Sequence, residues 1–397
     1  MRRVVTKSTL ATLGCIVLLP LSAWASSNDQ SPFSGEFKIG AGYASNPLRL
    51  PEGGESGAFV PFELRLDWEP VDSRERRFRM RFDLDGRRFG SDSLESAKRG
   101  RVRAEARYDW RLRPRGGAKH DLVLRARAQR DDRVWVSRRS GEDFELRSID
   151  ADSVSLADRY DADTYSAEFF YKRRSGPTRW EVELEAARRN YLEDYEDVAV
   201  VDSLDHERYL AKVRYRSRFL HETLELWGGA QVTWRDYDER WPRDAEGDDV
   251  LDAVQEFRDT SLRAEVRWRP WARIDRPERL EIGLEYRYGW RDDLYEGFYD
   301  RDTRDWELSI DSRLRRGVFL AFDVSTGTTE YLRYRTGNVS TNPLFTLEDL
   351  EVEARLALAT RWDVTVELGG AWLDADSSNP IYRYEEWSAH VALIWDF

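Results

Sequence analysis

Apolar and charged side chains alternate with a period of two along most of the chain. In the segments 77–85, 101–112 and 279–291, even-numbered positions are mainly aliphatic or aromatic, and odd-numbered positions are mainly charged. Successive side chains of a β-strand point to opposite faces, so each segment predicts a strand with one apolar and one charged face. An α-helix would scatter the charged residues over all of its faces.

The pattern predicts sixteen strands separated by connections of alternating length. The expected strand ranges are 35–44, 58–69, 77–85, 101–112, 120–130, 163–173, 179–190, 207–217, 222–235, 260–269, 279–291, 304–314, 317–330, 348–359, 363–374 and 384–397. Short connections follow the even members of this series and longer polar connections follow the odd members. Outer-membrane barrels have this plan, with short periplasmic turns and long extracellular loops. We therefore expect an all-β fold, a 16-stranded antiparallel up-and-down transmembrane β-barrel.

A soluble β-sandwich is the alternative fold, because its strands alternate as well. The positions of the tryptophans favour the membrane barrel. Trp68, Trp110, Trp180, Trp268 and Trp271 fall near the short connections, and Trp234, Trp290, Trp306, Trp372 and Trp387 fall near the long ones. Two aromatic girdles are expected where a barrel meets the two membrane interfaces. Sixteen strands joined by consecutive hairpins also suit an up-and-down barrel better than a Greek-key sandwich.

The chain ends with Val391, Leu393, Trp395 and Phe397 in strict alternation. This tail resembles the terminal aromatic signature of Gram-negative outer-membrane β-barrel proteins. The resemblance implies recognition of the last strand by the barrel-assembly machinery. A second stretch, from Gly42 to Leu50, resembles a motif near the first strand of β-barrel porin families found beside exopolysaccharide export genes. Ala44 stands where that motif usually has Asp, and no functional residue is carried over from it.

The first 25 residues have the features of a signal peptide. Arg2, Arg3 and Lys7 precede a short apolar run, and Ala23-Trp24-Ala25 fits the small-x-small cleavage rule, so residues 26–397 form a single barrel domain. The one cysteine, Cys15, lies in this segment, which suits export through an oxidising periplasm. Loss of three basic residues changes the formal charge from −12 to −12 − 3 = −15. Such acidity excludes general nucleic-acid binding.

If the apolar faces meet lipid, the charged faces line the lumen. The candidate pore-lining residues are Arg79, Arg81, Arg103, Arg107, Arg125, Arg127, Glu183, Lys212, Arg214, Arg216, Arg263 and Arg267. Glu307, Asp311, Glu351, Glu353 and Glu367 make the C-terminal half more acidic. One interpretation is that ion pairs between strands simply brace the wall. The other is that opposed basic and acidic sectors create a transverse field or an anion-selective patch.

Candidate catalytic chemistry is sparse. The four histidines, His120, His206, His221 and His390, show no metal-ligand spacing, and we expect neither a metal nor another cofactor. His390 and Ser388 share a face, but the alternation places both in the lumen, away from the outer surface where a barrel lipase acts. The acidic loops are candidates for divalent ions that bridge lipopolysaccharide, but no calcium-loop spacing is present. We therefore expect a non-enzyme.

The leading functional interpretation is a porin-like channel for polar or charged solutes in a Gram-negative outer membrane. A first alternative is the outer-membrane exit of an exopolysaccharide secretion system. That role predicts aromatic platforms in the lumen, where the alternation places few rings, namely Phe170 and Trp227. A second alternative is a non-conducting scaffold barrel, in which the long connection from Asp131 to Ala162 plugs the pore or binds a partner.

Overall fold

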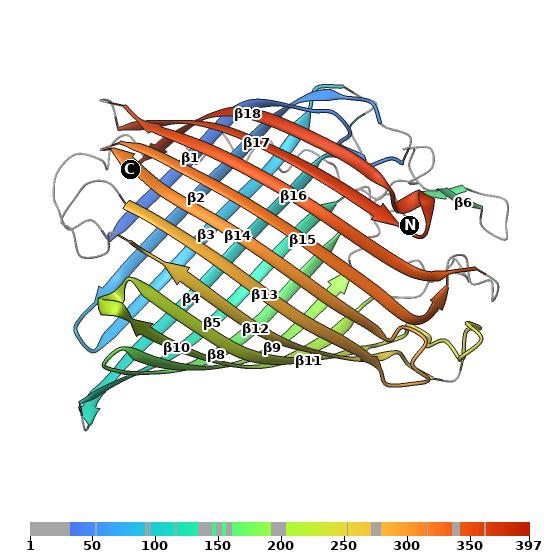
Figure 1. Ribbon diagram of the computed structural model, residues 1–397, viewed down its shortest axis with the longest axis horizontal. Helices are drawn as coiled ribbons and strands as arrows, with labels where there is room; N and C mark the ends of the chain where they lie inside the picture. The colour runs from blue at the N-terminus through green and yellow to red at the C-terminus, as the bar shows by residue number, and fades with distance from the viewer. Residues whose placement is uncertain are drawn as a thin grey trace, which may run out of the picture.

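A computed structural model shows sixteen strands of the described residues closed into one antiparallel barrel (Figure 1). The structure describes residues 32–51, 54–91, 94, 97–115, 117–133, 145–147, 153–155, 161–191, 204–251, 253–270, 279–315, 317–335, 342–360 and 363–397. Each strand pairs with its neighbour in the chain, and the last strand pairs with the first, so the barrel part of the sheet has no free edge. Closure removes the unpaired backbone groups that an open sheet would expose.

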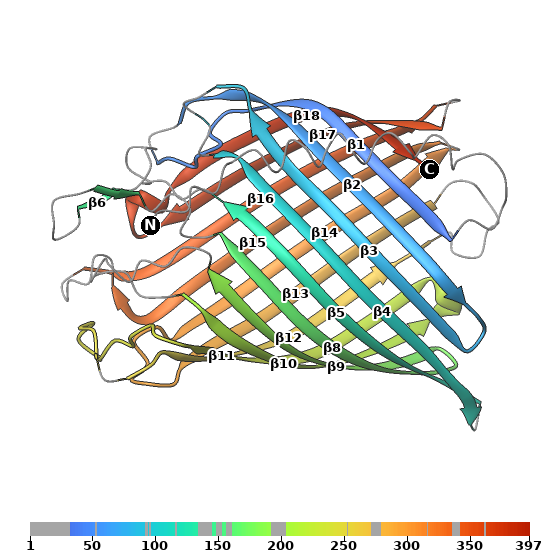
Figure 2. The same ribbon diagram turned by 180° about the vertical axis from the view of Figure 1, so that it is seen from behind.

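The strands of the barrel are long, and they cross the cylinder obliquely (Figure 2). Their bounds are β1 (Phe33–Ala44), β2 (Gly57–Asp72), β3 (Arg76–Phe89), β4 (Arg99–Arg115), β5 (Ala118–Arg133), β8 (Ala162–Ser175), β9 (Thr178–Tyr191), β10 (His206–Phe219), β11 (Leu224–Tyr237), β12 (Glu256–Trp268), β13 (Arg279–Asp293), β14 (Arg301–Arg315), β15 (Val318–Arg335), β16 (Leu344–Ala359), β17 (Val364–Ser377) and β18 (Tyr384–Asp396). Short 3₁₀ turns occupy η2 (Leu220–Glu222) and η4 (Pro380–Tyr382).

The predicted strand number and order are confirmed, and the predicted bounds are too short at several ends. β3 continues to Phe89 and β12 begins at Glu256, where charged residues such as Arg88 and Glu256 occupy the outward face and alternation gives no signal. A second difference lies in the connection from Asp131 to Ala162, expected to be loop. There β6 (Glu145–Arg147) and β7 (Ser153–Ser155) pair as a separate two-stranded sheet. No helix within the described ranges is long and apolar enough to cross a lipid bilayer.

Small residues allow the first and last strands to approach closely at the seam. Gly40 pairs with Ala392, and a Cβ atom added at Gly40 would lie 2.3 Å from the Val391 carbonyl oxygen. At the end of the seam, the Gly35 amide donates to the Phe397 carbonyl (2.7 Å), and the Phe397 amide donates to the Gly35 carbonyl (2.9 Å). The C-terminal residue therefore completes the ladder that closes the barrel.

The distribution of burial is the reverse of that in a soluble domain. The exposed side chains include Leu124, Leu184 and Leu262, which point outward from the middle of their strands. Among the buried side chains are Asp83, Glu168 and Glu225, which face the interior. Six of the predicted girdle tryptophans are exposed on the outside: Trp110, Trp180, Trp234, Trp268, Trp306 and Trp387. Trp271 and residues 1–25 lie outside the described residues. The single cylinder with outward-facing apolar side chains excludes the sandwich alternative.

Candidate functional site

The twelve predicted pore-lining residues lie on strands of the barrel and share the face of the sheet that carries the buried carboxylates. They are Arg79 and Arg81 on β3, Arg103 and Arg107 on β4, Arg125 and Arg127 on β5, Glu183 on β9, Lys212, Arg214 and Arg216 on β10, and Arg263 and Arg267 on β12. Eleven of the twelve lie within 4.0 Å of an opposite charge. Lys212 has no such partner among the residues that the structure describes.

The basic sector on β3 to β5 is held by buried carboxylates that each accept from two arginines. Asp83 accepts from Arg65 Nε at 3.1 Å and from Arg103 Nη2 at 2.7 Å. Glu168, whose side chain is 1% exposed, pairs with Arg125 and, at 3.5 Å, with Arg127. Because the planar guanidinium donates in a fixed geometry, such pairs hold the strands in register. In this sector the bracing interpretation accounts for the arginines.

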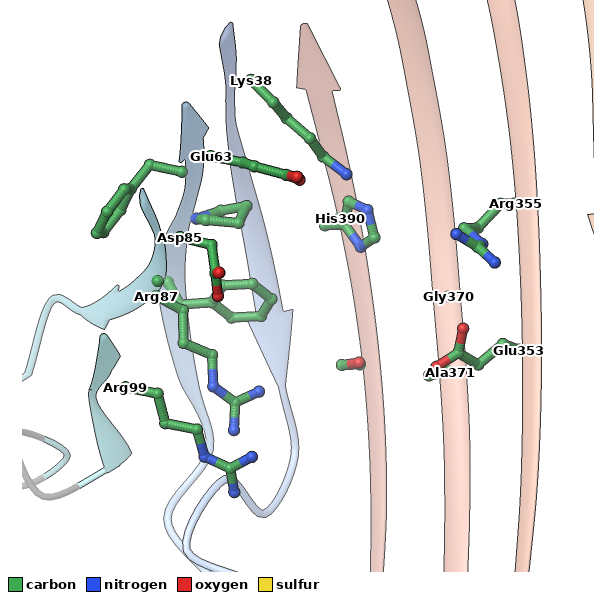
Figure 3. Close-up of a pocket in the computed structure, with 15 residues that line it drawn as sticks. Lys38, Glu63, Asp85, Arg87, Arg99, Glu353, Arg355, Gly370, Ala371 and His390 are labelled. Carbon is green, nitrogen blue, oxygen red and sulfur yellow. The ribbon is translucent and has the colours of Figure 1, made fainter. Parts of the chain in front are cut away.

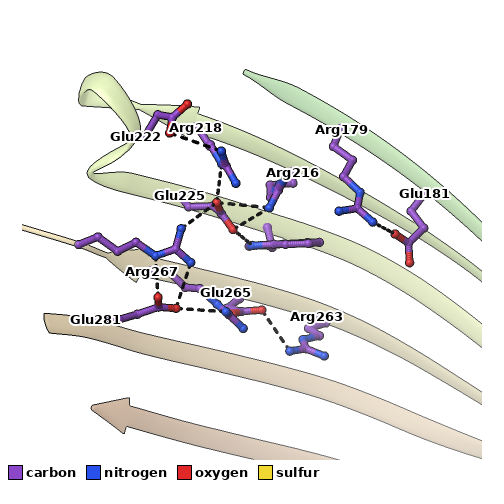
Figure 4. A network of polar contacts seen from close by, with 12 residues as sticks. Arg179, Glu181, Arg216, Arg218, Glu222, Glu225, Arg263, Glu265, Arg267 and Glu281 are labelled. Carbon is purple, nitrogen blue, oxygen red and sulfur yellow. Dashed lines mark hydrogen bonds and ion pairs between the residues drawn. The ribbon is translucent and has the colours of Figure 1, made fainter. Parts of the chain in front are cut away.

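Glu225 on β11 is the centre of a second network, near the short-connection end (Figure 4). Its carboxylate accepts from Arg218 Nε at 2.8 Å and from the Trp227 indole at 2.6 Å. Arg216 and Arg269 lie 3.4 and 3.5 Å away. The chain of ion pairs continues from Arg269 through Glu281, Arg267 and Glu265 to Arg263. One buried carboxylate is therefore shared by three arginines, two on β10 and one directly after the end of β12.

An acidic stripe on β14 and β16 has no such compensation. It consists of five inward-facing carboxylates: Glu307, Asp311, Asp349, Glu351 and Glu353. Within the described part of the chain, none of the five lies within 4.0 Å of a basic group. Eight strand steps separate β14 from β4 and β16 from β8 in either direction around the ring, so the stripe faces the arginine sector across the lumen (Figures 1 and 2).

The acidic stripe agrees with the predicted acidic C-terminal half, with one exception. Glu367 on β17 accepts from Lys38 Nζ at 2.7 Å and lies 3.1 Å from His390 Nε2. His390 lies on β18, which follows β17 in the chain, whereas Lys38 lies on β1, which only closure of the barrel brings near Glu367. Glu367 therefore links β17 to β1 and β18 at the seam, and it does not belong to the uncompensated stripe.

A cavity of about 410 Å³ lies on the inner face of this seam (Figure 3). Lys38, Arg87, Glu353 and His390 line it from both sides of the closure. Ser388 lines it as well, which confirms that Ser388 and His390 face inward. Among the described residues, no hydrogen bond joins Ser388 to His390, whose ring instead contacts Glu367. The arrangement lacks the nucleophile–base contact that an acyl-transfer site needs.

Three further carboxylates, Glu168, Glu183 and Glu185, place ligand atoms within 4.8 Å of one another on β8 and β9. Each of them is already paired with an arginine, Glu183 with Arg214 at 3.3 Å and Glu185 with Arg208. Three arginines at the same place oppose a cation, so we assign no metal to this cluster.

The sequence pattern missed most of the aromatic side chains inside the barrel. Phe170 and Trp227 do face inward, but a continuous arc of further rings lies at the long-connection mouth. Neighbouring centroids are 4.9–6.4 Å apart along Tyr191, His206, Tyr237, Phe257, Tyr299, Phe298, Tyr334, Tyr331, Phe345 and Tyr382. These rings come from strand ends and connections, where period-two alternation has no signal. The expectation of few inner rings is therefore wrong at the mouth.

Arg240 fastens the connection between β11 and β12 onto this arc. Its guanidinium lies 5.1 Å from the Tyr237 ring, 5.9 Å from Phe257 and 5.5 Å from Tyr299. Phe257 itself is 2% exposed. Edge-to-face ring contacts and cation–π contacts of this kind hold a connection in a defined position at the mouth.

Comparison with known proteins gives likenesses of architecture only. No protein-family model and no curated protein sequence matches the chain. Among solved structures, a loop L8 deletion mutant of OmpT, an outer membrane protein of Vibrio cholerae, is 8% identical over 92% of this chain and 98% of that chain, with a TM-score of 0.47. The outer membrane protein opdK of Pseudomonas aeruginosa is 12% identical over 92% and 99%, with a TM-score of 0.44. A bacterial polysaccharide outer membrane secretin is 11% identical over 91% and 98%, with a TM-score of 0.44. Likenesses at this level do not by themselves assign a function.

Proposed function

We propose that this protein is a porin-like channel in the outer membrane of a Gram-negative bacterium. The observation that carries the proposal is the inverted burial: apolar side chains face outward all around a closed cylinder, and charged side chains face its interior. Hydrocarbon accepts only such a closed sheet, and sixteen strands leave room for an aqueous lumen. In this orientation the short connections face the periplasm and the long ones face the exterior.

The proposed mechanism is passive and electrostatic. Arginines and carboxylates of the wall replace part of the hydration of a polar solute, and the lumen selects by size and charge. The uncompensated stripe on β14 and β16 raises the local concentration of cations, whereas the paired arginines opposite contribute little net charge. We therefore expect small-ion current to be carried mainly by cations, despite the many arginines in the wall.

Planar-bilayer recording of the purified barrel tests both parts of this proposal. A channel gives discrete conductance steps, and a tenfold KCl gradient gives a reversal potential of the sign set by cation flow. The double variant Glu351→Gln, Glu353→Gln should move that potential toward zero, because neither carboxylate has an ion-pair partner among the described residues whose loss would disturb the wall. A barrel that folds but stays silent would contradict the channel and favour the scaffold interpretation.

We also propose that the protein reaches the outer membrane as an exported precursor that the barrel-assembly machinery inserts. Signal peptidase removes residues 1–25, so the mature chain begins at Ser26, which intact-mass measurement of the exported protein checks. The assembly machinery recognises the last strand through Phe397, whose ring is exposed. Deletion of Phe397 should slow membrane insertion in cells while leaving folding in detergent possible. Lipid and lipopolysaccharide surround the outer belt and the rim.

The aromatic arc favours one second candidate, the exit of a polysaccharide secretion system. Sugar rings stack on aromatic side chains, and this candidate required rings inside the barrel, which the mouth supplies. Several rings of the arc are buried against one another, including Phe298 and Phe345. Binding of a polyuronate discriminates the two roles. An exit barrel should bind a long chain much more tightly than its monomer, whereas a porin should show no dependence on chain length.

A further inference from the structure

A recess of about 250 Å³ opens on the inner face between β10 and β13. The recess exists because two small residues, Gly229 and Ser261, lie among the long basic side chains that line it. Gly229 on β11 lies between Arg214 of β10 and Arg263 of β12 in one cross-strand row. A Cβ atom at Gly229 would lie 2.9 Å from the Val213 carbonyl oxygen, so a larger residue would crowd β10, and glycine leaves the inner face open at this position. In the next cross-strand row, the short side chain of Ser261 lines the recess.

Most of the cations around the recess are already paired, Arg214 with Glu183, Arg263 with Glu285, Arg267 with Glu281 and Arg287 with Asp305. Five basic residues line it, namely Lys212, Arg214, Arg263, Arg267 and Arg287, with Glu265 as the one lining carboxylate. Glu265 is already held by Arg263 at 3.1 Å and by Arg267 (Figure 4). Lys212 has no ion-pair partner among the described residues, and Arg214 Nε is buried without a hydrogen-bond acceptor. Lys212 is therefore the one lining cation that carries no counter-charge among the described residues.

One end of the recess is a tryptophan held in a fixed orientation. The Trp227 indole N–H donates to Glu225 at 2.6 Å, and the Arg216 guanidinium lies 5.0 Å from the centre of the ring. Trp227 lies two residues from Gly229 on the same face, roughly 7 Å along the strand. A solute that fills the gap at Gly229 with an anionic group therefore reaches the indole with a ring attached to that group. Gln231 and Ser261 add neutral hydrogen-bonding groups at the other end.

We propose that this recess binds a small carboxylate carried on a six-membered ring. The carboxylate lies over Gly229 against Lys212, which has no ion-pair partner among the described residues, and the ring lies against Trp227. The proposal rests on the proposed channel, since it names the class of solute that the lumen retains. Aromatic carboxylates and uronates share this chemistry. The volume suits one ring and not an oligomer.

Calorimetric titration of the folded barrel in detergent tests the proposal without requiring conduction. The probes are benzoate and glucuronate, with acetate as the anion that lacks a ring and glucose as the ring that lacks a charge. We expect benzoate, glucuronate or both to bind at least tenfold more tightly than acetate or glucose. Binding by benzoate alone assigns an aromatic carboxylate, and binding by glucuronate alone assigns a uronate.

The decisive variant is Lys212→Gln, which removes a charge without breaking any ion pair that the structure records. Loss of one partly desolvated charge contact should weaken binding by about fivefold. Lys172→Gln is the matched control, because Lys172 also faces inward on β8 without an ion-pair partner among the described residues but does not line the recess. It should leave affinity unchanged.

Three results would overturn the assignment: acetate binding as tightly as the ring acids, an equal loss in the Lys172 and Lys212 variants, or no binding by a barrel that is demonstrably folded. Silent bilayers combined with Lys212-dependent binding would refute the channel and leave the recess standing. Conductance without ring-acid binding would do the opposite, so the two failures are distinguishable.

Discussion

Neutralising Glu225 tests how far the ion-pair networks stabilise the barrel. The Glu225→Gln substitution keeps the size of the side chain and removes its charge. Glu225 is 2% exposed and is the shared acceptor of Arg218, Arg216 and Arg269. After the substitution, three guanidinium groups remain close together without their common counter-charge, and the new amide N–H₂ opposes their donors.

The expected loss follows from burial. Removing one partner of a buried charge cluster costs about 3–5 kcal/mol. The side chains of Arg218 and Arg269 are 29% and 28% exposed toward the lumen, where water screens them in part. We therefore expect the free energy of unfolding to fall by about 2–3 kcal/mol, somewhat below the fully buried case.

The matched control is Glu222→Gln in the adjacent turn. Glu222 also pairs with Arg218, at 3.6 Å, but its side chain is 69% exposed. An exposed pair of this kind contributes at most about 1 kcal/mol. The assay is reversible urea unfolding in lipid vesicles, followed by tryptophan fluorescence and by the mobility difference between folded and unfolded barrel in cold electrophoresis. Equal shifts for the two variants would refute the reasoning, because burial would then have no influence on the strength of the network.

Two further substitutions test the seam and the mouth. Gly40→Val should prevent closure of the barrel, because the new Cβ would lie 2.3 Å from the Val391 carbonyl oxygen. Gly228→Val is the control and should fold normally, because no atom lies within 4 Å of its added Cβ. The mobility of the folded barrel in cold electrophoresis checks both variants, and a folded Gly40→Val barrel would contradict the close approach of the strands. Arg240→Ala should accelerate proteolysis within 238–255, because it releases this connection from Tyr237, Phe257 and Tyr299. Arg304→Ala is the control: it removes the exposed ion pair with Glu330 and should leave the rate of proteolysis unchanged. Unchanged cleavage of the Arg240 variant would show that other contacts hold the connection.

Local alternation was informative wherever one face of a strand is apolar. It predicted the number and order of the strands, and it assigned Arg103 and Lys212 to the charged face, since a face is decided by position parity alone. It failed at strand ends such as 256–259, where charged residues occupy the outward face, and it therefore missed the inward ring of Phe257 and, at the end of β11, that of Tyr237.

The compensation of charge required the tertiary structure. The sequence contains an excess of arginine in one half and of carboxylates in the other, but it does not say which of them meet. Lys38 and Glu367 become neighbours only when β18 closes onto β1, and the Arg214–Gly229–Arg263 row exists only in one register of three strands. Period two specifies the direction of a side chain, whereas its partner depends on register and closure. For this reason the chain alone determined the barrel and its faces, and the folded cylinder decided which charges remain available to a solute.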